Sequence, residues 1–307
     1  MGEPTCAVHS RAQAIVFRRK FPRLLFQRRH GRLMARFEKS RSNRSAPTHT
    51  RRSHRSMNGP LSYIGGKRAL AKRIIAIFPE HTTYVETFAG GAQVFFRKQP
   101  SKVEVLNDLD REIVNFYRVC QQHYEELIRY LRFTLVSRAW FELLQATDPA
   151  TLTDIQRAAR YLYLSKNCYA GLVRHQNYGW RVAQPPSFNS ERLPATIKET
   201  HQRLARVQIE CLPYEEVLAR YDRPATLFYL DPPYYGRKLY NYNFNPDDFR
   251  KMAELLDKLR GKFVLSLNDI PEVRTIFKAF HIKGIDLAYT AQKIAGRRYC
   301  EVLITNF

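Results

Sequence analysis

The sequence has no long apolar run, few cysteines and no recognisable signal peptide. No stretch approaches the roughly 18 consecutive apolar residues that a membrane-spanning helix requires, which argues against an integral membrane protein. The five cysteines include no C-x-x-C pair and no cluster with histidine, so the sequence predicts neither a disulfide framework nor a zinc site. We therefore expect a cytoplasmic protein that needs no metal and does not associate with membranes.

Acidic residues are scarce relative to basic ones. The 307 residues include 51 Lys+Arg and 28 Asp+Glu, which gives a formal net charge of +23. Such an excess predicts a polyanionic partner, and nucleic acid is the first candidate. The hydrophobic content of 44% excludes a chain that is disordered throughout.

More than half of the charge lies in residues 1–56, which contribute +13, whereas residues 57–307 contribute +10. The first segment is rich in Arg, Ser, Thr and His and lacks hydrophobic periodicity, so we predict a basic, disordered extension. It is consistent with an arm that binds DNA, with a transit peptide, or with an extension upstream of the natural start. We favour the last interpretation, because Met57 stands immediately before the first motif.

Hydrophobic periodicity in the rest of the chain predicts an α/β fold. Residues 84–120 have the pattern of a β-α-β-α unit, which is typical of a parallel sheet with crossover helices. Helices are expected at 67–78, 124–134, 138–146, 154–166 and 246–259, and an irregular stretch at 167–194. Five further strands are expected at 207–212, 226–230, 263–267, 281–287 and 300–305. The sequence thus predicts a seven-stranded, mostly parallel sheet with helices on both faces and a mainly helical insertion after the second strand.

Two short motifs follow the first two predicted strands. Gly90 and Gly91 form a strand-to-helix turn, where glycine lets a ligand approach the backbone closely. Asp108 follows the next strand, roughly 20 residues later, where an acidic side chain is placed to bind a ribose diol. Taken alone, each motif also has a structural explanation: an ordinary tight turn for Gly90 and Gly91, and an ordinary helix cap for Asp108.

A third motif, Asp231-Pro232-Pro233-Tyr234, follows the apolar strand at 226–230. The prolines have no N–H and a fixed φ, so they hold the loop rigid and turn carbonyl groups outward. Asp231 supplies an acceptor at the carboxyl end of a strand, where ligands bind in open α/β sheets, and Tyr234 supplies a flat ring. This set suits a planar group that carries an NH₂. The alternative is a proline-rich loop with a capping aspartate, which the two upstream motifs disfavour.

The chain from about Pro60 to Phe307 resembles the Dam-like DNA adenine methyltransferases. The resemblance rests on four motifs in the family's order: Tyr63-Ile64-Gly65-Gly66-Lys67, Glu86-Thr87-Phe88-Ala89-Gly90-Gly91, Asn107-Asp108 and Asp231-Pro232-Pro233-Tyr234. It implies the methyltransferase fold, S-adenosylmethionine as cofactor and double-stranded DNA as partner. It also implies a catalytic domain at 57–119 and 206–307, with a target-recognition domain at 120–205 between its two parts. We expect a monomer.

The resemblance further implies roles for single residues. In the cofactor pocket, Tyr63 and Lys67 would contact S-adenosylmethionine, Phe88 and Gly90 would line its site, and Asp108 would bind the ribose hydroxyls. At the reacting group, Asp231 would touch both the cofactor and the target amino group, Pro232 would offer its carbonyl within the rigid Pro232-Pro233 loop, and Tyr234 would stack on the base.

A fifth stretch, residues 161–174, matches the family's target-recognition segment and implies that Tyr169, Leu172 and Arg174 contact DNA. Two positions depart from the family's pattern: Tyr63 stands where Trp is frequent, and Ala170 where Asn can occur. Residues 235–244 are rich in Tyr and Asn, which suits a loop closing over the cofactor and base, although ordinary loop packing explains about half of them equally well.

Together these motifs predict a site-specific DNA methyltransferase that modifies adenine N6, of the kind found in restriction-modification systems and phages. A base inside a duplex must first be flipped out of the stack, at a cost of a few kcal/mol. The same motifs also fit an enzyme that methylates RNA or cytosine N4, and a DNA-binding relative without activity. A protein-glutamine methyltransferase is disfavoured, because that family typically has Asn in place of Asp231.

Overall fold

The structure, a computed structural model, describes residues 57–63, 67–171, 176–179, 184–287 and 299–307. The chain divides into two units, 1–51 and 52–307, and all the described residues belong to the second. The predicted disordered segment 1–56 lies outside the described residues. None of the helices described is long and apolar enough to cross a bilayer.

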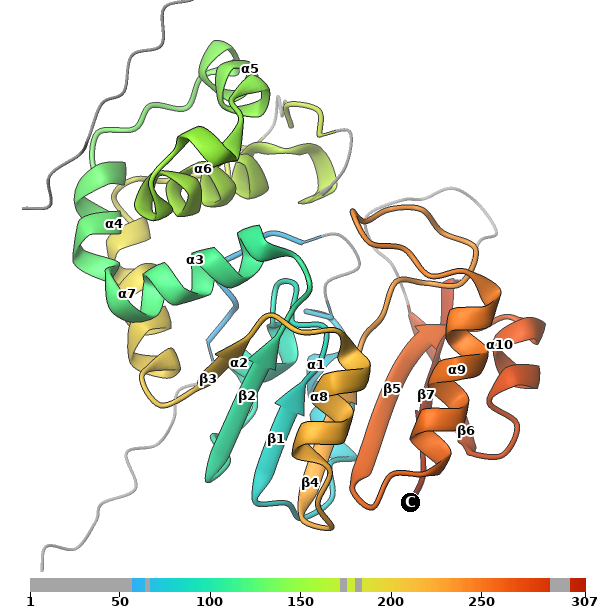
Figure 1. Cartoon of the computed structure of the whole chain (residues 1–307). Coiled ribbons are helices and arrows are strands. Elements are labelled where there is room, and N and C mark those ends of the chain that lie inside the picture. Colours follow the sequence, from blue (N-terminus) through green and yellow to red (C-terminus); the bar gives the residue numbers. More distant parts are fainter. Residues whose placement is uncertain (1–56, 64–66, 172–175, 180–183, 288–298) are drawn as a thin grey trace, which may run out of the picture. The chain divides into compact units, whose positions relative to one another are not determined.

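A single seven-stranded sheet organises this unit (Figure 1). Its strands are β1 (Thr83–Glu86), β2 (Val103–Asn107), β3 (Gln208–Glu210), β4 (Thr226–Leu230), β5 (Lys262–Asn268), β6 (His281–Leu287) and β7 (Tyr299–Thr305). They lie in the order β3-β2-β1-β4-β5-β7-β6. Strands β1 to β5 pair in parallel, whereas β7 runs antiparallel to both β5 and β6. The prediction of a seven-stranded, mostly parallel sheet is confirmed.

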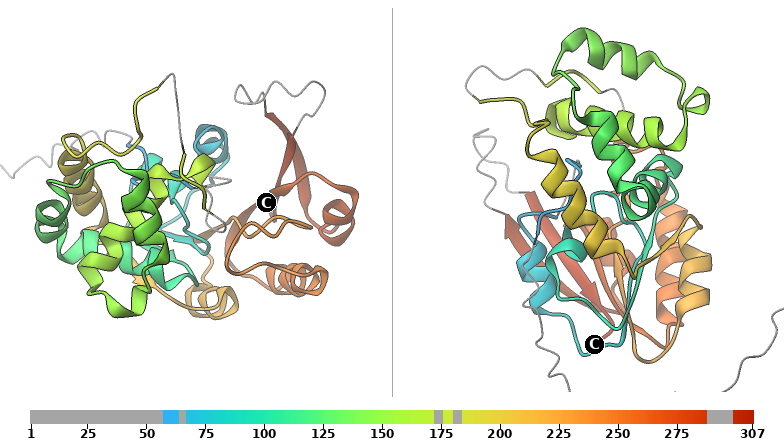
Figure 2. Two further views of the ribbon diagram at one scale, coloured as in Figure 1. Left: turned by 90° about the horizontal axis from the view of Figure 1, so that it is seen from above. Right: turned by 90° about the vertical axis from the view of Figure 1, so that its left-hand side faces the viewer.

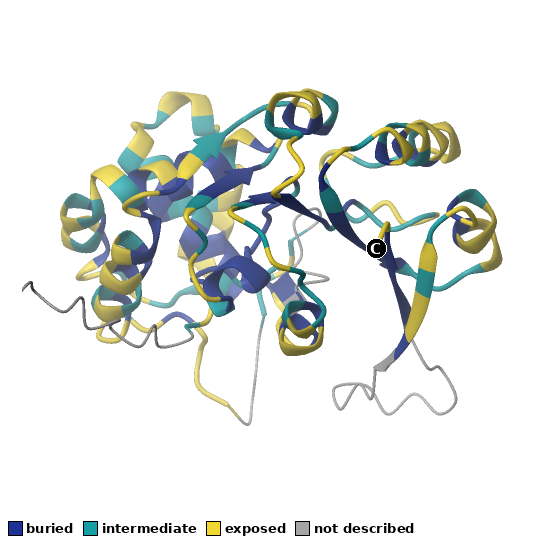
Figure 3. Ribbon diagram, turned by 90° about the horizontal axis from the view of Figure 1, so that it is seen from below, coloured by how far each residue is buried: buried dark blue, intermediate teal, exposed yellow. Residues whose placement is uncertain are grey.

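Successive side chains of a strand point to opposite faces of the sheet. Both faces carry buried apolar side chains, and helices cover each of them. On β1, Tyr84 joins one buried apolar cluster and Val85 the other. The first cluster is completed by α1 (Ala71–Ala76), α2 (Gln93–Arg97) and α3 (Arg111–Gln122), and the second by α8 (Tyr214–Tyr221), α9 (Pro246–Asp257) and α10 (Pro271–Ile276). Figure 2 shows helices on either side of the sheet, and Figure 3 shows buried central strands between helices whose outer faces are exposed.

Between α3 and β3 the chain forms the helical segment that the sequence predicts. Its helices are α4 (Tyr124–Leu131), α5 (Arg138–Ala146), α6 (Asp154–Asn167) and α7 (Leu193–Leu204), with short 3₁₀ turns η1 (Pro149–Thr151) and η2 (Tyr169–Gly171). The start of α6 is fixed by a capping box, in which Thr153 and Gln156 satisfy each other's backbone N–H groups. Helix α7 is an addition to the predicted helices of this segment.

A buried ion cluster ties this helical segment to the sheet. Glu104 on β2 accepts hydrogen bonds from Arg203 on α7 and, at 2.6 Å, from Lys98 after α2. The Arg203 guanidinium also stacks on the Phe95 ring, 3.6 Å from its centroid. Burial raises the pKa of Glu104, but the two cations lower it more, so its pKa lies below the usual value. The carboxylate therefore remains ionised and paired.

Candidate active site

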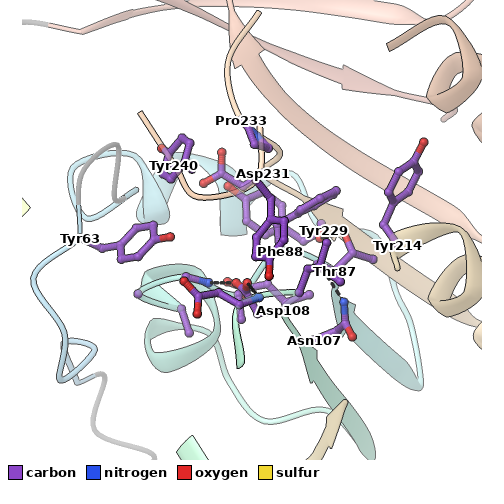
Figure 4. Close-up of a pocket in the computed structure, with 18 of the residues that line it drawn as sticks. Tyr63, Thr87, Phe88, Asn107, Asp108, Tyr214, Tyr229, Asp231, Pro233 and Tyr240 are labelled. Atoms are coloured by element: carbon purple, nitrogen blue, oxygen red, sulfur yellow. Dashed lines mark hydrogen bonds between the residues drawn. The ribbon is translucent and has the colours of Figure 1, made fainter. Parts of the chain in front are cut away.

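A cavity of about 540 Å³ opens at the carboxyl ends of β1, β2 and β4 (Figure 4). From β1 the chain adds β2 and β3 on one side, and then β4 and β5 on the other. A reversal of this kind leaves a crevice beyond the strand ends, which is where open α/β sheets bind ligands. The cavity is lined by these sequence-predicted residues: Tyr63, Lys67, Phe88, Gly90, Asp108, Asp231 and Pro233.

The glycine turn after β1 is held by two hydrogen bonds at Gly90. Gly90 has a φ of +46°, a conformation that side chains with a Cβ adopt only with strain. Its N–H donates to Asp108 Oδ2 at 2.8 Å, and its carbonyl accepts from the Tyr117 hydroxyl at 2.7 Å. A Cβ added at Gly90 would meet Tyr63 Cε1 at 2.9 Å. The absence of a side chain at Gly90 therefore lets the Tyr63 ring lie against the turn.

We expect Gly90→Ala to lower the free energy of unfolding by about 1–2 kcal/mol, the usual cost of the left-handed region for a residue with a Cβ, and also to weaken ligand binding in the cavity, because Tyr63 must move. The matched control is Gly236→Ala, since Gly236 has a φ of +72° but nothing within 4 Å of its added Cβ. Denaturant titration and calorimetry with S-adenosylmethionine measure both effects. Equal loss of ligand affinity in the two variants would contradict the role of the Tyr63 contact.

Two polar residues at the end of β2 have different surroundings. Asp108 accepts hydrogen bonds from the backbone N–H groups of Gly90 and Asp110, at 2.8 and 2.9 Å. Burial raises the pKa of Asp108 to about 7, although these bonds oppose the shift. The side chain of Asn107 instead bonds the Thr87 carbonyl and both backbone groups of Leu212. Asn107 thus holds the strand ends together, while the Asp108 carboxyl lines the cavity.

Asp231, the first residue after β4, belongs to a polar cluster in which Lys67 and Glu301 are buried and Asp231 is partly exposed. Lys67 Nζ lies 2.6 Å from Asp231 Oδ1, 2.9 Å from the Tyr234 hydroxyl and 3.1 Å from Glu301 Oε1. Burial raises the pKa of Asp231, Lys67 lowers it and Glu301 raises it, with a result of about 6. Burial lowers the pKa of Lys67, but Asp231, Tyr234 and Glu301 outweigh this, so its pKa lies well above the usual value. At neutral pH the cluster therefore contains an ammonium group beside ionised Asp231.

The remaining residues of the third motif lie beside the cavity rather than on its wall. Pro232 is buried. The Tyr234 ring lies under the Lys67 ammonium, 4.7 Å from it, and its hydroxyl contacts Glu301 Oε1 at 3.0 Å. In this arrangement, Tyr234 packs against the cluster at both its ring and its hydroxyl.

Aromatic side chains from the segment after the third motif complete the cavity. Tyr240 stacks on Tyr63, with ring centroids 5.9 Å apart, and Phe244 packs against Phe88 and Tyr214. The Asn241 amide donates to Asp110 Oδ2 at 3.0 Å. Residues 240–244 all line the cavity, and Figure 4 shows Tyr63 and Tyr240 on the same side of it.

Of the predicted DNA-contacting residues, Tyr169 lies in η2 and is 58% exposed, whereas Leu172 and Arg174 lie outside the described residues. Within the described part of the chain, no group of three or more His, Cys, Asp or Glu side chains is arranged to hold a metal ion.

Several polar residues of the site were not among the predicted ones. Glu86, the last residue of β1, lines the cavity, and burial raises its pKa to about 8 although hydrogen bonds from Tyr84 and Phe95 oppose this. Its position at a strand end was a signal for it. Ser266 and Glu301 come from strands β5 and β7, and their sequence surroundings contain no motif that points to this site.

The chain belongs to the family of D12 class N6 adenine-specific DNA methyltransferases, whose model matches residues 63–291. It is 25% identical over 271 residues to the type II methyltransferase M1.LlaDCHI of Lactococcus lactis subsp. cremoris, covering 80% of this chain and 94% of that one. It is also 25% identical over 236 residues to the retron Ec67 DNA adenine methylase of Escherichia coli, covering 73% and 82%.

A third relative is longer. The DNA N-6-adenine-methyltransferase of Escherichia phage P1 is 25% identical over 236 residues, which are 71% of this chain but 30% of the phage protein. Family membership confirms the resemblance to DNA adenine methyltransferases and makes S-adenosylmethionine the cofactor.

Proposed function

We propose that this protein transfers a methyl group from S-adenosylmethionine to the N6 amino group of an adenine flipped out of duplex DNA. The observation that carries the proposal is the shared cavity: the Asp231 carboxylate faces the same space as the Gly90 turn and the Asp108 carboxyl. One end thus suits a nucleoside-like cofactor and the other a planar amino group. The family match supports this chemistry.

The residues of the cavity fit the cofactor. The Asp108 carboxylate is an acceptor suited to two ribose hydroxyls, and the turn at Gly90 leaves room for a ligand against the backbone. Phe88 and Tyr214 offer apolar walls, and Tyr63 stands over the turn. The volume of about 540 Å³ lies within the range of ordinary cofactor sites. When bound, S-adenosylmethionine supplies an activated methyl group on a sulfonium.

The chain's part in the reaction is positioning. The lone pair of an adenine amino group is delocalised into the ring, so it is a weak nucleophile. We propose that Asp231 Oδ2 and the Pro232 carbonyl accept hydrogen bonds from the two N–H groups, which concentrates electron density on nitrogen. Lys67 holds the other oxygen, Oδ1, and so fixes the orientation of the carboxylate. Alignment of this kind is worth several kcal/mol of barrier in itself.

We further propose that Tyr234 stacks on the flipped base through the ring face opposite Lys67. We also propose that Tyr169, Leu172 and Arg174 belong to a target-recognition domain at 120–205 that contacts the duplex. The +10 charge of residues 57–307 suits contacts with phosphate groups, which dominate the affinity of proteins for DNA and make it salt-dependent. We propose that a monomer carries out the reaction.

Methyl transfer from tritiated S-adenosylmethionine tests the function. Duplex DNA from a host without adenine methylation is offered beside RNA and beside a duplex of only G and C, and the labelled nucleosides are separated. We expect label in N6-methyldeoxyadenosine of the adenine-containing duplex and none in the other two. Label confined to RNA or to N4-methylcytosine would overturn the proposed substrate, and no label in any nucleic acid would overturn the activity.

A further inference from the structure

Three polar groups converge on one carboxylate oxygen behind Asp231. Glu301 Oε1 accepts hydrogen bonds from the Ser266 hydroxyl at 2.8 Å and from the Tyr234 hydroxyl at 3.0 Å, and it lies 3.1 Å from Lys67 Nζ. Ser266 lies on β5 and Glu301 on the neighbouring strand β7. The Glu301 residue is 3% exposed. The adjacent strands therefore deliver a second buried carboxylate to the site of the third motif.

A second carboxylate is costly at this position. Each buried ion carries a desolvation penalty of several kcal/mol, which a partner must offset. A single pair of Lys67 and Asp231 would be balanced in charge, yet here one ammonium group lies between two carboxylates, 2.6 Å from Asp231 and 3.1 Å from Glu301. An apolar residue at position 301 would avoid this penalty. Among the residues that the structure describes, charge balance therefore does not explain Glu301.

We propose that Glu301 is a positioning residue for methyl transfer: it holds the Lys67 ammonium and the Tyr234 hydroxyl, and it keeps Lys67 from neutralising Asp231 completely. Asp231 is then the stronger hydrogen-bond and proton acceptor for the target amino group. This inference rests on the proposed function, because it assigns Glu301 a part in that same site.

The charge of Asp231 matters because positive charge moves to N6 during methyl transfer. The N6 lone pair forms the new N–C bond to the methyl carbon, and the electron pair of the broken S–C bond stays on sulfur. The positive charge passes from sulfur to N6, which then loses a proton. An ionised Asp231 beside N6 stabilises this developing charge and can take the proton before water does. A carboxylate whose charge is fully offset by Lys67 does both less well.

The groups around Asp231 give the direction of a measurable effect. Lys67 approaches Asp231 from the segment before α1, Ser266 from β5 and Glu301 from β7. Tyr234 and Tyr240 approach it from the loop after β4, Tyr229 from β4 and Glu86 from β1. Burial raises the pKa of Asp231, Lys67 lowers it, and Glu301 raises it by repulsion. Removing the charge of Glu301 therefore lowers the pKa of Asp231.

The test is Glu301→Gln, which keeps the size and an acceptor oxygen but removes the charge. The matched control is Glu104→Gln, a buried glutamate with two cationic partners away from the cavity. We expect Glu301→Gln to lower kcat up to about 100-fold, the order of loss from misplacing a reacting group. It should leave KM for duplex DNA and Kd for S-adenosylmethionine nearly unchanged and move the acid limb of the kcat profile to lower pH. Glu104→Gln is expected to lower Tm without moving that limb.

An acid limb that stays in place in Glu301→Gln, or that moves equally in the control, would overturn the inference. If Glu301→Gln fails to fold, Glu301→Asp replaces it. The aspartate keeps the charge. An acid limb of the kcat profile at the wild-type pH therefore supports the proposal, and an acid limb at lower pH overturns it. The wild-type protein separates this test from the test of function: a protein that methylates no DNA refutes the proposed function, whereas an active protein with an indifferent Glu301 refutes only the inference.

Discussion

Replacing Asp231 with alanine is expected to lower kcat for methyl transfer on the order of 10³-fold, within the range for removing a group that stabilises developing charge. The carboxylate is proposed to accept the hydrogen bond that directs the amino lone pair, and alanine has no acceptor. The fold should persist, because Lys67 keeps Glu301 as a charged partner 3.1 Å away. Filter-bound label from tritiated S-adenosylmethionine gives kcat, and circular dichroism reports the fold.

Two comparisons sharpen this prediction. Asp231→Asn keeps an acceptor oxygen and should lose less activity than Asp231→Ala. Asp257→Asn, at the exposed end of α9, should retain wild-type kcat. Burial raises the pKa of Asp231, with Lys67 opposing and Glu301 assisting, to about 6, so wild-type kcat should fall as pH decreases below about 6. An alanine variant with near-normal kcat would remove Asp231 from the reaction.

The second large effect is expected at Asp108. Burial raises the pKa of Asp108 to about 7, so its carboxyl is ionised above that pH. There, Asp108→Ala should raise Kd for S-adenosylmethionine about 10–100-fold, because hydrogen bonds to a charged group contribute about 1.5–3 kcal/mol and each 1.4 kcal/mol is tenfold in affinity. Asp108→Asn keeps one acceptor and should lose less. Isothermal titration calorimetry measures both variants.

Asp108 also accepts two backbone N–H groups, so a control must separate loss of loop structure from loss of ligand contact. Asp222 provides it, because its carboxylate accepts the backbone N–H groups of Arg260 and Gly261 outside the cavity. Asp222→Asn should lower stability and leave Kd unchanged. If Asp108→Ala bound S-adenosylmethionine as tightly as the wild type, the ribose role proposed for Asp108 would be wrong.

Strongly periodic segments were predictable from the sequence. The strand expected at 226–230 and the helix expected at 138–146 have the same bounds as β4 and α5. The helix expected at 67–78 is shorter in the structure, where α1 spans Ala71–Ala76. Short helices α8 and α10, of 8 and 6 residues, were not predicted. Their few apolar positions make a weak periodic signal, and packing against the sheet stabilises them instead.

The candidate site likewise contains residues that were predictable from the sequence and residues that were not. Gly90, Asp108 and Asp231 were predictable because each follows a strand, and the carboxyl ends of parallel strands meet at one edge of the sheet. Lys67 was expected to contact the cofactor and does line the cavity, but the sequence did not indicate that its ammonium contacts Asp231 and Tyr234. Glu301 is 70 residues beyond Asp231, and its approach depends on the antiparallel pairing of β7 with β5.

The sequence by itself determined the α/β class, the family and the edge of the sheet where the reaction is proposed, because these depend on local periodicity and on motifs at strand ends. Only the tertiary structure decided that Lys67 lies between Asp231 and Glu301, and that Tyr63 lies against the Gly90 turn. The physical reason is that burial and long-range pairing set which charges meet, and neither leaves a pattern in the neighbouring residues.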